Sequence, residues 1–164
     1  MNLTLALEFK VYGNPGPQGS KRHIGGGRML ESSAKVKPWR EAVTAAAMAR
    51  RAALGLELLD GPLRVDMVFT FVRPASHYGT GRNKGRLKDS APLRPATAPD
   101  LSKLARSTED ALNKFVWVDD ARVVEYGYLA KVWASSHTPT EAFYADALDA
   151  PGAIIRIYQI GANQ

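Results

Sequence analysis

The sequence contains no cysteine and no long hydrophobic run, and these two absences exclude several classes of protein. Without cysteine there are no disulfides and no zinc–thiolate sites, so the fold must depend on an ordinary hydrophobic core. No apolar run approaches the roughly 18 residues that a transmembrane helix requires, and an acid, Glu8, comes too early for a signal peptide. We therefore expect a soluble cytoplasmic protein with no membrane partner and no small-molecule cofactor.

The length and composition predict a single domain. The 164 residues are enough for one real core, and no change in composition indicates a second domain. Apolar residues make up 45% of the chain and charged residues 23%, which is a globular balance rather than a disordered one. We predict one domain over residues 1–164, in which residues 73–99 form a long basic loop because they are rich in Gly, Pro and cations and lack an apolar period.

Positive charge is concentrated in two blocks, and this distribution indicates a polyanionic partner. The net charge is +6, and residues 10–51 carry nine Lys and Arg against two acids. Residues 73–106 carry eight against two, whereas residues 107–164 reverse the balance with four against eight. A basic surface next to a group of carboxylates fits bound nucleic acid better than a solvated surface without a partner.

Hydrophobic periodicity predicts an α+β fold. Strands are predicted at residues 3–12, 63–72, 115–133 (with a break near the two adjacent Asp residues) and 153–160. Helices are predicted at residues 39–54 and 101–113, and a loop or short helix at residues 134–149. In the second helix, the polar side is predicted to carry Lys103, Arg106, Ser107 and Asp110. The order of these elements favours a single domain with a mixed β-sheet packed by helices.

Acids stand at both ends of the second predicted helix. Asp100 occupies the N-cap position, and Asp119 and Asp120 follow the helix. A helix over 101–113 advances about 18 Å, and a strand over 115–120 covers about 17 Å. If that strand folds back along the helix, Asp120 arrives level with Asp100. Only one of the two adjacent acids can then face a shared site, because successive strand side chains alternate.

Carboxylates next to a phosphate path would repel nucleic acid unless a cation lay between them. Mg²⁺ prefers oxygen ligands, bridges carboxylates to phosphates and can activate a bound water. Asp100 and Asp120 have the right chemistry to hold it, and Arg106 could stabilise transition-state charge. Ordinary structural roles stay open: Asp100 as a helix cap, Arg106 and Asp110 as an ion pair, and the two adjacent acids as a turn.

At these residues the sequence resembles the RusA family of Holliday-junction resolvases, which are phage and prophage endodeoxyribonucleases. The matching residues are Pro99, Asp100, Ser102, Arg106, 110–112, Trp117, Asp119, Asp120 and 123–124, preceded by a similar Gly/Pro/basic segment at 13–22. The resemblance implies a homodimer with a basic DNA-binding face. It also implies cleavage of branched DNA by Mg²⁺-dependent phosphodiester hydrolysis, with Mn²⁺ as a possible substitute, in recombination and repair. A phage-encoded member would act in the host cytoplasm.

Carried over by position, Asp100 matches the first metal-binding acid and Asp120 the later one. Arg106 stands where the family usually has its catalytic lysine. Arginine keeps the charge and offers a planar fork for phosphate, but it donates a proton less readily, so electrostatic stabilisation is the expected role.

Ser102 replaces the middle acid of the family pattern. The serine could contribute to metal binding through water; otherwise Asp119, Asp110 or Asp66 supplies the missing charge, or activity is weak. A similar serine in actinophage relatives favours an actinophage-like variant over an inactive site.

Two basic segments and the start of the second helix are predicted to contact DNA phosphates, which gives affinity without sequence reading. The predicted contacts are Lys21, Arg22, Arg28, Lys35, Arg82, Lys84, Arg86, Lys88 and Lys103. Tyr78, in the long loop, could stack on an unpaired base or pack within the loop.

Two other functions stay open from the sequence. The chain could be a non-catalytic DNA-binding protein that retained the fold after losing the middle acid. A restriction-type nuclease fits less well, because Arg122 stands where such a site has lysine and because the acids flank a helix instead of two adjacent strands.

Overall fold

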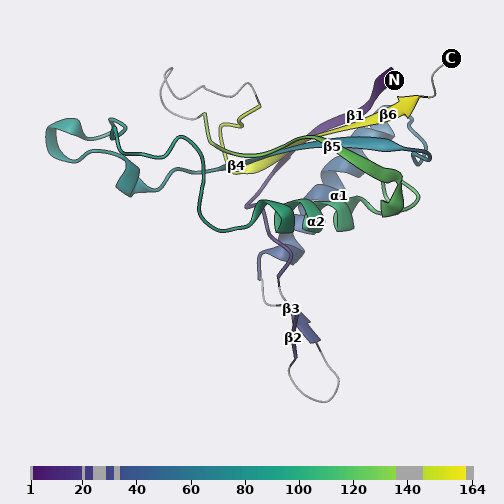
Figure 1. Cartoon of the computed structure of the whole chain (residues 1–164), viewed down its shortest axis with the longest axis horizontal. Helices are drawn as coiled ribbons and strands as arrows, with labels where there is room; N and C mark the ends of the chain where they lie inside the picture. Colours follow the sequence, from purple (N-terminus) through teal and green to yellow (C-terminus); the bar gives the residue numbers. More distant parts are fainter. Residues whose placement is uncertain (1, 20, 24–28, 32–33, 136–145, 162–164) are drawn as a thin grey trace.

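The computed structural model describes residues 2–19, 21–23, 29–31, 34–135 and 146–161. A four-stranded sheet has the order β1-β6-β4-β5 and is built from β1 (Asn2–Tyr12), β4 (Leu63–Phe71), β5 (Val123–Trp133) and β6 (Gly152–Gly161). Strand β6 is antiparallel to β1 and β4, whereas β4 and β5 are parallel. Helices α1 (Val36–Ala53) and α2 (Leu101–Leu112) cover one face of this sheet (Figure 1). The predicted α+β domain with a mixed sheet is confirmed.

The hydrophobic core lies between the sheet and the two helices. The core-facing residues of β4 are Leu63, Val65, Met67 and Phe69, all fully buried. They meet the fully buried Trp39 of α1 and Trp117, which follows α2. The later part of β4 is buried on both faces, as its unbroken apolar run predicts, because Val68 and Thr70 are also inaccessible.

The prediction of a strand at residues 115–120 is wrong, because the chain turns at the end of α2 instead of extending. Lys114 has a φ of 67°, in the left-handed region. The backbone N–H groups of Phe115 and Val116 then both donate to the carbonyl of Leu112. A single-turn helix η3 (Asp120–Arg122) follows, and β5 begins only at Val123.

Two segments project from the body of the molecule (Figure 1). One is a short antiparallel ribbon of β2 (Lys21–His23) and β3 (Met29–Glu31), which the periodicity did not predict. The other connects β4 to α2 and is called here the crossover loop (residues 73–99). It contains only two single-turn helices, η1 (Ala75–His77) and η2 (Gly81–Asn83), as its lack of an apolar period predicts.

The crossover loop is held together by its own backbone and is anchored at its base. Within it, Gly79 donates to the carbonyl of Arg86, and Lys88 donates to that of His77. At the base, the Arg73 guanidinium lies over the Trp133 ring, 5.1 Å from its centroid. The loop is therefore an ordered arm connected to the edge strand β5.

None of the helices in the described part of the chain is both long enough and apolar enough to cross a bilayer. Most of the loop or short helix predicted at 134–149 lies outside the described residues.

Candidate active site

Helix α2 divides into a buried face and a polar face. The buried residues are Leu104, Ala105, Ser107, Thr108, Ala111 and Leu112. The sequence prediction placed Ser107 on the polar side, which is wrong: this side chain is fully buried. Position 107 lies three residues after Leu104 and four before Ala111, so it belongs to the same helical stripe as these core residues.

A surface pocket of about 390 Å³ lies between α2, η3 and β5. Its walls are formed by Ser102, Ala105, Arg106, Glu109, Asp110, Asp120, Tyr126 and Leu129. Positions 102, 106 and 109 are three or four residues apart and share one side of the helix. The pocket thus brings together three predicted site residues, namely Ser102, Arg106 and Asp120.

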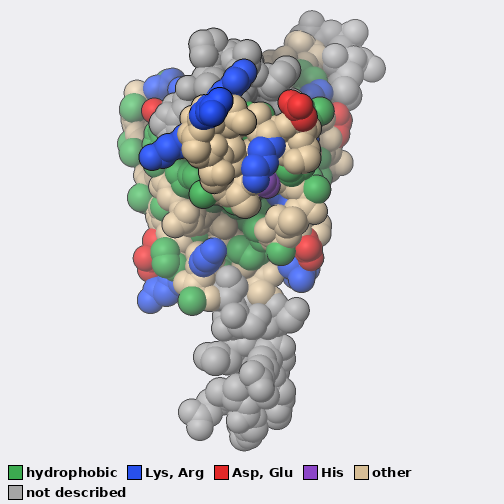
Figure 2. All heavy atoms as spheres, turned by 90° about the vertical axis from the view of Figure 1, so that its left-hand side faces the viewer, with side chains coloured by type: hydrophobic (Ala, Val, Ile, Leu, Met, Phe, Trp, Pro, Cys, Tyr) green, Lys and Arg blue, Asp and Glu red, His purple; other side chains and the backbone are tan. Residues whose placement is uncertain are grey.

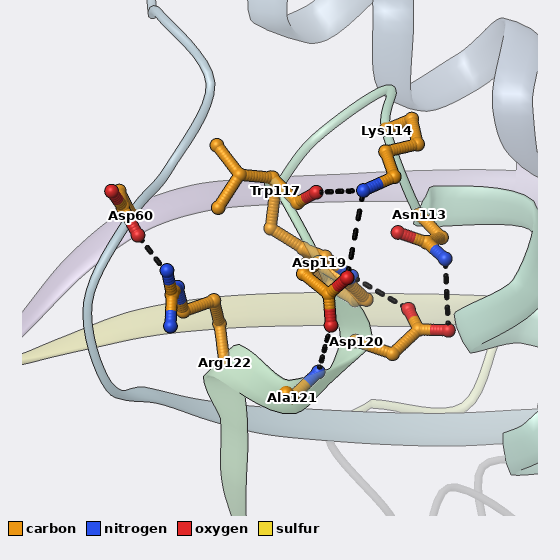
Figure 3. Close-up of polar contacts among 9 residues, drawn as sticks. Asp60, Asn113, Lys114, Trp117, Asp119, Asp120, Ala121 and Arg122 are labelled. Carbon is orange, nitrogen blue, oxygen red and sulfur yellow. Dashed lines mark hydrogen bonds and ion pairs between the residues drawn. The ribbon is translucent and has the colours of Figure 1, made fainter.

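Asp120 is held in the pocket by two side-chain donors (Figure 3). The Trp117 indole Nε1 donates to its Oδ1 over 2.9 Å, and the Asn113 Nδ2 donates to its Oδ2 over 3.1 Å. Trp117 is fully buried, so the position of this donor is fixed by the core. Each carboxylate oxygen has two lone pairs, so both oxygens of Asp120 can still accept a further ligand.

Asp119 has a different set of contacts from its neighbour, as Figure 3 shows. Its Oδ1 accepts a 2.9 Å hydrogen bond from the backbone N–H of Ala121 and so caps η3. Its Oδ2 lies 3.5 Å from the Lys114 Nζ. The Ala121 hydrogen bond, and then the charge of Lys114, lower the pKa of Asp119. Of the two adjacent acids, only Asp120 lines the pocket.

Asp100 lies at the N-cap position of α2, but its side chain makes no capping hydrogen bond. It is 61% exposed and forms a 3.2 Å ion pair with Lys103. The alternative role as a side-chain helix cap is therefore wrong. Asp100 does not line the pocket, and Asp120 does not return level with it: Asp120 contacts Asn113, at the opposite end of α2. The tight turn that replaces the expected strand explains this difference.

Arg106 is the exposed cation of the pocket. In the part of the chain that the structure describes, it forms neither an ion pair nor a hydrogen bond. The alternative pairing with Asp110 is wrong, because Asp110 binds the Arg40 guanidinium of α1 at 2.5 Å. The Arg106 guanidinium is thus available to an anion that enters the pocket.

Sequence reasoning missed two polar residues of the pocket, Glu109 and Tyr126. The Tyr126 hydroxyl, on β5, donates a 2.5 Å hydrogen bond to Oε1 of Glu109. Burial raises the pKa of Glu109, and the charges of Asp120 and Asp110 raise it further, against the Tyr126 hydrogen bond. Burial also raises the pKa of Tyr126. The helical spacing from Ser102 and Arg106 could have identified Glu109, whereas nothing local marks Tyr126.

The residues of this pocket lie within a region that matches a known protein family. The family model of endodeoxyribonuclease RusA matches residues 13–141. The chain belongs to the RusA family. It is also similar to the uncharacterized protein YqaN of Bacillus subtilis (strain 168), with 30% identity over 121 residues that cover 73% of this chain and 82% of YqaN. Membership of the RusA family implies an endonuclease that acts on DNA, with Holliday junctions as the general substrate of the family.

The predicted DNA contacts of this RusA-family chain lie on several elements. The crossover loop carries Arg82, Lys84, Arg86 and Lys88, all exposed. Figure 2 looks onto the end of the molecule formed by this loop, where Lys and Arg side chains (blue) lie over its surface. Tyr78 is half-buried within the loop, and its backbone forms an isolated antiparallel β-bridge with that of Leu87.

The remaining predicted contacts lie near the two helices and the ribbon. Lys103 is half-exposed on α2, and Lys35 is exposed just before α1. Lys21 and Arg22 belong to β2, where only the backbone is described, and Arg28 lies outside the described residues.

The oxygen donors of the RusA-family pocket determine which ions it could hold. No three Asp, Glu or His side chains among the described residues lie close enough together to enclose a metal ion. Mg²⁺ does not require such a cage, because it keeps several waters and binds through one or two carboxylates plus substrate phosphate. The pocket offers oxygen donors from Ser102, Glu109, Asp110 and Asp120, and this donor set fits a hydrated Mg²⁺.

Proposed function

We propose that this RusA-family chain is a Mg²⁺-dependent, structure-selective endodeoxyribonuclease that hydrolyses phosphodiesters in branched DNA. Its proposed role is the resolution of Holliday junctions in recombination and repair, with Mn²⁺ able to replace Mg²⁺. The observation that carries this proposal is the pocket that joins Asp120 and Arg106, both of which lie within the residues that the family model matches.

Asp120, Asp100 and Arg106 each have a separate role in the proposed reaction. Asp120 is the proposed metal ligand in the pocket. The family pattern also assigns a metal-binding role to Asp100, which is exposed and uncapped but lies at the N-terminal end of α2, outside the pocket, so it would bind a separate ion. Mg²⁺ in the pocket would neutralise phosphate charge and supply an activated water. Arg106 would bind a phosphate oxygen and stabilise the charge that builds up in the transition state.

The crossover loop would hold the DNA backbone beside this pocket. Its four exposed cations can contact phosphates without reading sequence, which suits a substrate recognised by shape. We propose that the active form is a homodimer, because resolution of a junction requires two cuts. The proposed site of action is the cytoplasm, which for a phage-encoded, actinophage-like protein is that of the host.

Cleavage of a labelled synthetic four-way junction tests the proposal. The full chain with Mg²⁺ should cut the junction, and Asp120→Asn should abolish cutting while sparing junction binding. Asp60→Asn is the matched control, because Asp60 is another acid near η3 but pairs with Arg122, away from the pocket, and should leave cleavage unchanged.

Two observations favour a second candidate, a non-catalytic DNA-binding protein. Ser102 offers a neutral hydroxyl where the family pattern has an acid, and no three-acid metal cage exists among the described residues. Tight junction binding by the wild-type chain with no cleavage at any Mg²⁺ or Mn²⁺ concentration would establish this alternative.

A further inference from the structure

The serine at position 102 leaves the RusA-type site with one negative charge fewer than the family pattern. A hydroxyl binds a hard divalent cation more weakly than a carboxylate does, because it carries no charge. Ser102 nevertheless lines the same pocket as Asp120. A functional site would therefore need another carboxylate that reaches this pocket.

Three acids suggested by the sequence are committed to other contacts. Asp119 caps η3 and does not line the pocket. Asp66 accepts hydrogen bonds from the Tyr128 backbone and from Arg64, and it points away from the helices because its neighbours in β4 face the core. Asp110 lines the pocket but is neutralised by its ion pair with Arg40.

Glu109 differs from these acids in both position and environment. It lies on the same side of α2 as Ser102, two helical turns further along, and it lines the same pocket as Asp120. Its carboxylate has one hydrogen bond, from the neutral Tyr126 hydroxyl to Oε1, which leaves Oε2 without a hydrogen bond in the described part of the chain. A phenol that donates to one oxygen fixes the carboxylate without neutralising its charge, as donors commonly do for metal-binding carboxylates.

The two carboxylates of Glu109 and Asp120 repel each other across a partly buried pocket. This repulsion is one of the reasons that the pKa of Glu109 is raised, after burial. A divalent cation between the two groups would convert the repulsion into attraction. The pocket thus has the charge and the oxygen ligands that a hydrated Mg²⁺ requires.

We propose that Glu109 is a metal ligand of this chain. It binds the ion beside Asp120 and supplies the carboxylate that Ser102 does not provide. This inference rests on the proposed nuclease function and identifies the second acid of its pocket.

Direct measurement of Mn²⁺ binding tests the role of Glu109 independently of cleavage. The full chain is titrated with Mn²⁺, and the free ion is measured by electron paramagnetic resonance. Glu109→Gln is expected to weaken Mn²⁺ binding by about tenfold or more. Glutamine keeps an oxygen that accepts from Tyr126, so the change removes the charge and not the hydrogen bond. The matched control is Glu125→Gln, since Glu125 is a partly exposed acid of β5 that pairs with Arg64 and does not line the pocket.

Thermal unfolding in the absence of metal provides the second measurement. Removal of a repelling charge should leave the melting temperature of Glu109→Gln equal to or above that of the wild type. Equal Mn²⁺ affinity in wild type and Glu109→Gln would overturn the proposal, as would an equal loss in Glu125→Gln. Junction cleavage by the same preparation of the wild-type chain tests the nuclease function separately. An uncut junction would contradict the nuclease proposal, whereas the role of Glu109 is decided by the Mn²⁺ titration alone.

Discussion

The indole Nε1 of Trp117 donates a 2.9 Å hydrogen bond to Oδ1 of Asp120, so a core residue orients an acid of the pocket. Trp117→Phe keeps most of the packing but removes this donor. We expect the substitution to lower junction cleavage by about tenfold, the effect typical of losing a group that orients a metal-binding residue. Cleavage rates and urea unfolding should be measured together.

Trp39→Phe is the control for this prediction. Trp39 is also fully buried and also donates through its indole, to the Thr108 hydroxyl over 3.1 Å, but it is not part of the pocket. Both variants should lose stability, whereas only Trp117→Phe should lose cleavage per folded molecule. An equal loss of cleavage in the two variants would show that the Trp117 hydrogen bond has no specific role.

Substitution of Asp100 separates a chemical role from a structural one. Because its side chain makes no capping hydrogen bond, Asp100→Asn should cost little stability. Its loss as a metal ligand should nevertheless abolish cleavage and spare junction binding. The melting temperature should remain close to that of the wild type. A variant that still cuts at the wild-type rate would remove Asp100 from the proposed site.

The crossover loop should contribute to DNA affinity through charge. Neutralisation of a phosphate-binding cation is expected to reduce the slope of log affinity against log salt by about one. Lys84→Gln should show this change in junction binding measured over a salt series. Lys10→Gln, which removes an exposed cation of β1, serves as the control. Identical slopes for the two variants would argue against a DNA-binding role for this loop.

The left-handed backbone conformation of Lys114 should affect the free energy of unfolding. Glycine adopts a φ of 67° without steric cost, whereas a residue with a Cβ pays roughly 1 kcal/mol for it. Lys114→Gly and Lys114→Ala lose the same side-chain contacts, so they differ mainly in this backbone term. Urea unfolding should find the glycine variant more stable than the alanine variant by about 1 kcal/mol. Equal stabilities would contradict the argument.

The fold could be predicted largely from apolar periodicity. Strands β1, β4 and β6 and both α-helices lie where alternation or helical spacing places them. The error after α2 arose because residues 115–118 alternate like a strand, while Lys114, which is not glycine, adopts a turn conformation that its residue type does not favour. The β2–β3 ribbon is too short to give a periodic signal.

The pocket could be predicted only in part, because a site depends on contacts between elements. Local spacing and the family pattern identified Asp120, Arg106 and Ser102. Tyr126 enters the pocket because β5 pairs with β4 and passes beside α2, and no property of the tyrosine itself indicates this position. Sequence-distant pairing of this kind also decides that Asp110 binds Arg40 of α1.

The crossover loop lies in the connection between the parallel strands β4 and β5. None of the residues that line the pocket belongs to the tip of this loop, residues 79–89. The backbone hydrogen bonds described for residues 79–89 stay within the crossover loop, and the base of the loop is anchored by Arg73 and Trp133. Changes in the length or composition of the tip should therefore leave the arrangement of α2, η3 and β5 intact. Substrate preference could diverge rapidly among relatives while the chemistry of cleavage stays the same, and grafting of tips between relatives offers a direct route to altered branch selectivity.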